Sequence, residues 1–97
     1  WREIPFTVKL PAHEVHTSLP PSEQYVLVQG VIDCLVEEKE GFLLLDFKTD
    51  RAGSRQDLSL YYRQLYFYSR AVEIIWKKPV QESWLCFLET EEAVQVK

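Results

Sequence analysis

A short apolar segment, Phe42–Lys48, constrains the fold of this chain more than any other feature. Its first four residues are Phe-Leu-Leu-Leu, which is typical of a strand in the interior of a sheet. The earlier segment Tyr25–Val36 is rich in valine, isoleucine and leucine and also predicts a strand. The polar stretch Glu37–Gly41 between them favours a turn. Together they predict a β-hairpin whose later strand is central in a sheet.

From Asp57 to Trp76 the apolar spacing changes to that of a helix. The recurring apolar positions are Leu58, Tyr61, Leu65, Tyr68, Val72 and Ile75. Lys77 and Lys78 complement the negative end of a helix dipole, and Pro79 ends the helix. This segment therefore predicts one long amphipathic helix.

The other segments complete an α+β pattern. Strands are expected at Ile4–Leu10 and Val80–Leu88, and Ala93–Val96 is a candidate for a short last strand. Pro11–Ser22, with three prolines, and Thr49–Gln56 are expected to be loops. The predicted order is β-β-β-α-β, which indicates a mixed sheet with the long helix on one face.

Size and composition indicate one packed domain. The chain has 97 residues, of which 46% are apolar and 13% aromatic. It contains no apolar run near the roughly 20 residues that span a bilayer, so no membrane partner is expected. It has no initiator Met and is interpreted as a piece of a longer protein. The two cysteines and two histidines lack the spacing of a zinc site, and the cysteines are expected to be buried in a reducing cytosol.

The carboxylate of Asp46 follows three leucines, where an unpaired charge is costly. Lys48, two residues on, lies on the same face of the strand. If the hairpin turns between Lys39 and Glu40, Asp33 lies directly opposite Asp46, with Cβ atoms about 5 Å apart. Two carboxylates at that distance repel unless a cation lies between them, and Mg²⁺ or Mn²⁺ suits oxygen ligands.

Two alternatives to this site stay open on spacing alone. A bulge at Gly41 would shift the register by one residue and separate the two carboxylates. Asp46 and Lys48 could also be an ordinary surface ion pair beside a solvated Asp33.

Three motifs occur in order and are similar to those of one nuclease family. They are G-x-x-D at Gly30–Asp33, D-x-K-T at Asp46–Thr49, and Q-x-x-x-Y at Gln64–Tyr68. This arrangement resembles the RecB family within the PD-(D/E)xK nuclease superfamily, and in particular the nuclease domain of AddA (RexA) type helicase–nuclease subunits. The resemblance spans nearly the whole chain and implies a restriction-endonuclease-like core.

The resemblance also implies a site and a role for each residue in it. Asp33, Asp46 and the backbone carbonyl of Phe47 would ligate Mg²⁺, with Mn²⁺ as a substitute, and Lys48 would act on the attacking water. Gln64 and Tyr68 would lie beside the active site and the DNA. The implied catalytic set is Asp33, Asp46, Lys48, Gln64 and Tyr68.

The family context makes residues 1–97 the nuclease core of a larger helicase–nuclease protein of the bacterial cytoplasm. Its implied activity is exonuclease-type cleavage of DNA in double-strand break repair and recombination. The implied partners are DNA and a second subunit of the AddB/RexB type, with ATP used only in the helicase part. In the family an upstream helix with a His also approaches the metal, and these 97 residues contain no counterpart of it.

Basic residues are concentrated in one part of an acidic chain. The net charge is −4, yet residues 48–78 hold seven basic and three acidic residues. This distribution suggests a track for DNA phosphates, and a merely solvated helix face is the alternative. Tyr61, Tyr62, Tyr66 and Phe67 are interpreted as core or interface residues, with base-stacking platforms as the alternative. The predicted DNA-binding residues are Arg51, Arg55, Arg63 and Arg70.

Two other functions share part of this pattern. A non-catalytic DNA-binding or subunit-docking module could keep the fold without the chemistry. A stand-alone resolvase or restriction-like nuclease would share the metal centre but not the Q-x-x-x-Y helix.

Overall fold

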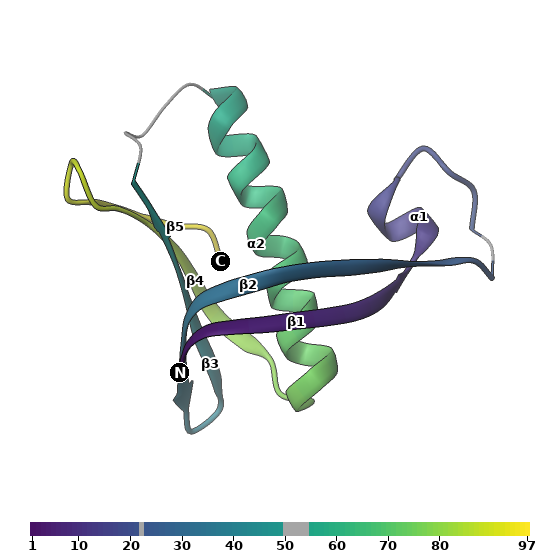
Figure 1. The fold of residues 1–97 in the computed structure, drawn as a ribbon, viewed down its shortest axis with the longest axis horizontal. Coiled ribbons are helices and arrows are strands. Elements are labelled where there is room, and N and C mark those ends of the chain that lie inside the picture. Colours follow the sequence, from purple (N-terminus) through teal and green to yellow (C-terminus); the bar gives the residue numbers. More distant parts are fainter. Residues whose placement is uncertain (22, 50–54) are drawn as a thin grey trace.

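The computed structural model describes residues 1–21, 23–49 and 55–97, with the side chains of residues 55–57 excepted. The elements in these ranges are β1 (Arg2–Pro11), α1 (Ala12–Val15), β2 (Tyr25–Glu38), β3 (Gly41–Lys48), α2 (Arg55–Trp76), β4 (Val80–Phe87) and β5 (Glu92–Gln95). The five strands of this described part form one sheet in the order β1-β2-β3-β4-β5, and α2 lies across it (Figure 1). The predicted α+β fold, a restriction-endonuclease-like mixed sheet with one long helix, is confirmed.

The hairpin of β2 and β3 has the predicted register. Paired residues have numbers that sum to 79, from Cys34 opposite Leu45 to Glu38 opposite Gly41. Gly41 is therefore not a bulge. A Cβ atom there would lie 2.6 Å from the carbonyl oxygen of Pro79, so glycine is needed for close packing.

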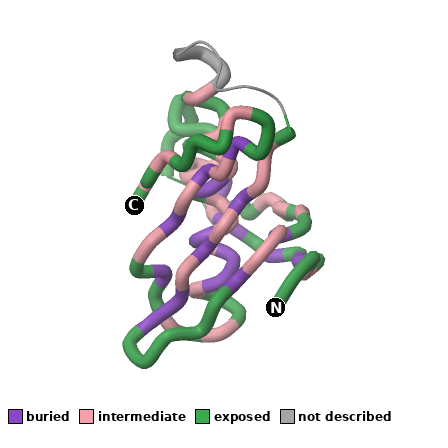
Figure 2. The backbone as a smooth tube through the Cα atoms, turned by 90° about the vertical axis from the view of Figure 1, so that its left-hand side faces the viewer, coloured by how far each residue is buried: buried purple, intermediate pink, exposed green. Residues whose placement is uncertain are grey.

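The central strand, β3, pairs antiparallel with β2 and parallel with β4. A parallel pair needs a long crossover, and α2 supplies it. Along β3, Phe42, Leu44 and Asp46 are buried, while the residues between them are only half-buried; Figure 2 shows this alternation of purple and pink along the strands. One face of β3 thus belongs to the core beneath α2.

The core lies between α2 and the sheet. Its fully buried residues include Leu35 of β2, Leu44 of β3, Leu65 and Val72 of α2, and Leu85 of β4. The rings of Trp1, Phe42 and Trp76 also cluster, with centroids 5.9–6.3 Å apart. This packing fixes the position of α2 over β3.

One predicted loop is in part a helix. The sequence predicts a loop over Pro11–Ser22, but Ala12–Val15 form α1 at the far end of the β1–β2 hairpin (Figure 1). The Glu14 carboxylate accepts hydrogen bonds from Tyr66 Oη at 2.7 Å and Arg70 Nε at 2.5 Å. A helix of four residues is too short to show a period, and these contacts with α2 hold it in place. None of the helices in the described ranges is long and apolar enough to cross a bilayer.

Candidate active site

Asp33 and Asp46 form the centre of the candidate site. The β2–β3 ladder ends at the pair of Cys34 and Leu45, so Asp33 and Asp46 come next in the same register. Asp33 Oδ2 accepts a hydrogen bond from the backbone N–H of Phe47 at 2.8 Å. Burial raises the pKa of Asp46, and a hydrogen bond with Asp33 raises it further, while Lys48 opposes the shift. The two carboxyl groups are therefore direct neighbours, as the predicted register requires.

The oxygen atoms of this pair fit a bound cation. Asp46 is only 3% exposed, and its Oδ2 atom is buried without a hydrogen bond from any described residue. Lys48 Nζ forms an ion pair with this oxygen at a distance of 2.9 Å. A carboxylate that is paired with one ammonium keeps further oxygen lone pairs, and these suit coordination to a hard cation.

The backbone carbonyl of Phe47 is a further candidate ligand for a cation. In an extended strand the N–H and C=O of one residue point to the same side. Because the N–H of Phe47 reaches Asp33, its carbonyl also faces the β2 side. The described residues contain no group of three or more His, Cys, Asp or Glu side chains that could hold a metal. The ligand set that the family resemblance implies, two carboxylates and the backbone carbonyl of Phe47, stays a prediction.

Lys48 is held in place by residues of α2. Its Nζ donates a hydrogen bond to Gln64 Oε1 at 2.7 Å and lies 4.3 Å from the centroid of the Tyr61 ring. Gln64 Nε2 in turn donates to Tyr68 Oη at 2.9 Å. The amide of Gln64 thus accepts from the lysine and donates to the phenol. This chain of contacts links the D-x-K-T motif on β3 to the Q-x-x-x-Y motif on α2.

The glycine of the G-x-x-D motif makes room for this arrangement. A Cβ atom at Gly30 would lie 2.9 Å from ring atoms of both Phe6 and Tyr68. The two rings meet edge to face, with centroids 5.3 Å apart. Burial raises the pKa of Tyr68, and the Asp46 carboxylate adds to the effect, so the phenol stays protonated. Gly30 therefore lets Tyr68 approach β2 close to the carboxylate pair.

The backbone is irregular directly beside Asp33. Arg2 pairs with Cys34 and Ile4 pairs with Ile32, whereas Glu3 between them has a φ of 52°. A non-glycine residue with positive φ is rare and strained, and such strain is frequent at functional sites. A cavity of about 360 Å³ opens at this point, lined by Arg2, Glu3, Asp33 and Phe47. The cavity gives access to Asp33 from the β1 side.

Two of the predicted DNA-binding arginines, Arg63 and Arg70, have described side chains. Arg63 donates a hydrogen bond to the Val15 carbonyl, and Arg70 forms an ion pair with Glu14. Both arginines therefore contact α1. Arg51 lies outside the described residues, as does the side chain of Arg55. Their role in DNA binding stays a prediction.

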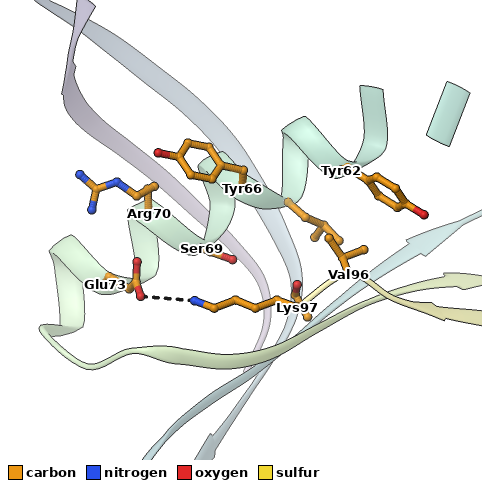
Figure 3. Close-up of a pocket in the computed structure, with 9 residues that line it drawn as sticks. Tyr62, Tyr66, Ser69, Arg70, Glu73, Val96 and Lys97 are labelled. Carbon is orange, nitrogen blue, oxygen red and sulfur yellow. Dashed lines mark ion pairs between the residues drawn. The ribbon is translucent and has the colours of Figure 1, made fainter. Parts of the chain in front are cut away.

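A second cavity, of about 320 Å³, lies on another side of α2. It is lined by Tyr62, Tyr66, Arg70 and the C-terminal residues Val96 and Lys97, among others. Figure 3 shows Lys97 reaching across it to Glu73, whose carboxylate lies 3.8 Å from the ammonium. None of Asp33, Asp46, Lys48, Gln64 or Tyr68 lines this cavity.

One residue near the site has a role that its sequence pattern does not predict. Tyr61 packs against the core as the pattern predicts, and its ring also lies under the Lys48 ammonium. Its position three residues before Gln64, on the same face of the helix, is the signal that points to it.

Comparison with known proteins agrees with this geometry. The family model described as the PD-(D/E)XK nuclease superfamily matches residues 1–97. Several curated proteins, each named as the A subunit of an ATP-dependent helicase/nuclease, are also similar. The protein of Moorella thermoacetica is 50% identical over 91 residues, which cover 91% of this chain and 6% of the relative. That of Desulforamulus reducens is 44% identical over 98 residues, covering 98% of this chain and 8% of the relative.

A third relative, from Oceanobacillus iheyensis, is 40% identical over 103 residues, which cover 98% of this chain and 8% of the relative. The chain thus spans less than a tenth of the length of these relatives. It belongs to the PD-(D/E)XK nuclease superfamily. The resemblance to AddA-type proteins, inferred from three short motifs, is confirmed by the same matches.

Proposed function

We propose that this chain is the nuclease core of an ATP-dependent helicase–nuclease and that it hydrolyses DNA phosphodiester bonds. The observation that carries the proposal is the neighbouring pair Asp33 and Asp46, joined through Lys48 to Gln64 and Tyr68. A docking module has no chemical need for two adjacent carboxylates, one of them buried, beside a lysine.

Mg²⁺, with Mn²⁺ as a substitute, is the proposed cofactor. Asp33, Asp46 and the Phe47 carbonyl would hold it. When bound, such a cation polarises a phosphodiester and lowers the pKa of a coordinated water. Lys48 would place its ammonium beside the attacking water and offset the negative charge that develops in the transition state. Gln64 fixes the direction of the ammonium through its 2.7 Å contact, and Tyr68 fixes Gln64.

The wider context follows from the relatives. Their name describes one subunit of an ATP-dependent helicase/nuclease, and we extend it to the protein that carries this chain. Residues 1–97 would be one nuclease core within that protein, acting as an exonuclease in double-strand break repair and recombination. ATP would serve the helicase part, and the partners would be DNA and a second protein of the AddB/RexB type in the bacterial cytoplasm.

The test is cleavage of end-labelled DNA by the full-length protein with Asp46→Asn. We expect a loss of at least about a hundredfold, because the variant keeps the shape of the side chain and removes a metal ligand. Glu37→Gln, an exposed acidic residue on the same hairpin, is the matched control and should cleave normally. Normal cleavage by Asp46→Asn would contradict the proposed site.

A further inference from the structure

A groove beside the active site is not used by the proposed chemistry. It lies between β2 and α2, has a volume of about 280 Å³, and is lined by Val28, Gln29, Leu60, Arg63, Gln64, Phe67 and Tyr68. Gln64 and Tyr68 are the residues that connect α2 to Lys48. The groove therefore shares two residues with the candidate active site.

The walls of the groove are suited to a flat aromatic group. Val28, Leu60 and Phe67 give it apolar sides, and the Leu60 side chain is 61% exposed. The Arg63 guanidinium lies over the Phe67 ring, 5.4 Å from its centroid. The amides of Gln29 and Gln64 lie at the same groove and can bond the polar edge of a ligand. A bare phosphate would gain little from these apolar walls.

We propose that this groove is a nucleobase subsite, in which Phe67 stacks a base of the strand that is being cut. This inference rests on the proposed function. Every nucleobase presents a π-face to an aromatic ring, so such a subsite tolerates any sequence. Because paired bases are stacked inside a duplex, only an unpaired base can enter a side pocket. The subsite therefore positions a single strand for cleavage.

The groove also lies at a suitable place along β2. Gln29 precedes Asp33 by four residues, and at about 3.3 Å per residue this puts the groove about 13 Å from that carboxylate. A strand that passes Asp33 and follows β2 would bring a neighbouring base to Phe67. Phe67 also packs against the core, so its ring has a fixed orientation. A fixed ring holds a base with little loss of conformational freedom.

The test uses the full-length protein with single-stranded oligonucleotides and no ATP. Each oligonucleotide carries one abasic site at a different position near a mapped cleavage point. For the wild type, we expect the single-turnover cleavage rate to fall about tenfold when the abasic site occupies one particular position, because the stacked base is missing. In Phe67→Leu, which keeps the apolar packing, intact and abasic strands should be cleaved at similar rates.

Two further variants serve as controls. Phe67→Tyr keeps an aromatic face and should keep the abasic penalty. Tyr62→Leu removes an exposed aromatic of α2 outside the groove and should behave as wild type. An abasic penalty that is absent in the wild type or unchanged in Phe67→Leu would overturn the subsite while leaving the nuclease intact. A wild type that cleaves neither strand would overturn the proposed function and this inference with it.

Discussion

The two ends of β3 lie beneath the same helix but carry opposite kinds of side chain. At one end, Phe42 and Leu44 are fully buried, and Phe42 packs near Trp76. At the other end, Asp46 and Lys48 occupy the same face, and Lys48 contacts α2 through a hydrogen bond and an aromatic ring. We call these the core end and the site end of β3.

Burial has opposite consequences at the two ends. At the core end it removes apolar surface from water and stabilises the fold. At the site end it leaves a carboxylate with a raised pKa, whose buried oxygen forms an ion pair with Lys48. Because β3 and α2 extend through both ends, packing at the core end positions the residues at the site end. Changes at the core end should therefore alter stability, and changes at the site end should alter chemistry.

The largest expected effect on stability is at the core end. Leu44→Ala should lower the free energy of unfolding by about 2–5 kcal/mol, because it leaves a cavity beneath α2. Denaturant unfolding of the chain measures this. Asp46→Asn, two residues away on the same face, should lower the free energy of unfolding by less than Leu44→Ala does. The variant loses an ion pair with Lys48 but also removes a charge that burial destabilises. Equal losses of unfolding free energy in the two variants would contradict the distinction between the core end and the site end.

A substitution at Gly30 should change both the stability of the fold and the rate of DNA cleavage. Gly30→Ala places a methyl group 2.9 Å from the Phe6 and Tyr68 rings, so at least one ring must move. Overpacking of this kind costs about 1–3 kcal/mol. We also expect slower DNA cleavage, since Tyr68 holds Gln64. The free energy of unfolding and the DNA cleavage rate of this variant should both decrease. An unaffected cleavage rate would show that cleavage does not depend on the position of Tyr68.

A smaller effect is expected from Gln64, which touches no reacting group in the proposed chemistry. Gln64→Leu keeps the size of the side chain and removes its contact with Lys48. Cleavage should fall about tenfold, as for residues that orient a catalytic group, and the unfolding midpoint should stay nearly constant. Gln95→Leu, an exposed amide on β5, is the control. A normal cleavage rate in Gln64→Leu would show that Lys48 does not need this support.

The smallest effect concerns α1, away from both ends of β3. The hydrogen bond from Arg70 lowers the pKa of Glu14 below its ordinary value. A carboxylate with a lowered pKa in the folded state stabilises the fold above its unfolded pKa, and this stabilisation is lost as pH falls through the folded pKa.

Glu14→Gln should therefore cost about 1 kcal/mol or less near pH 7, and the difference from wild type should shrink below about pH 4. Urea unfolding at both pH values measures it, with Glu40→Gln in the exposed hairpin turn as the control. A difference that is the same at both pH values would show that the ion pair is not its source.

The β2–β3 hairpin and the carboxylate pair could be predicted from the sequence because they depend on local patterns. The two-residue turn at Lys39 and Glu40 sets the hairpin register, and the register sets Asp33 beside Asp46. The position of Asp46 after three leucines indicated its burial. These features depend on residues close together in the sequence or directly opposite in a hairpin.

The features that could not be predicted from the sequence depend on contacts between distant segments. Helix α1 is held by Tyr66 and Arg70, more than 50 residues further along the chain, and no local pattern reveals it. The same contact occupies Arg70, which the charge pattern alone assigned to DNA. The strained backbone at Glu3 arises where β1 meets Asp33, and an isolated Arg-Glu-Ile sequence gives no sign of it.

Calorimetric titration with Mn²⁺ tests the central claim most directly. It should be made on the full-length protein without nucleotide, in the wild type and in Asp33→Ala and Asp46→Ala. The account predicts that a Mn²⁺ site present in the wild type is lost in both variants while each stays folded. Identical Mn²⁺ binding in the wild type and in the two folded variants would contradict a metal centre shared by Asp33 and Asp46.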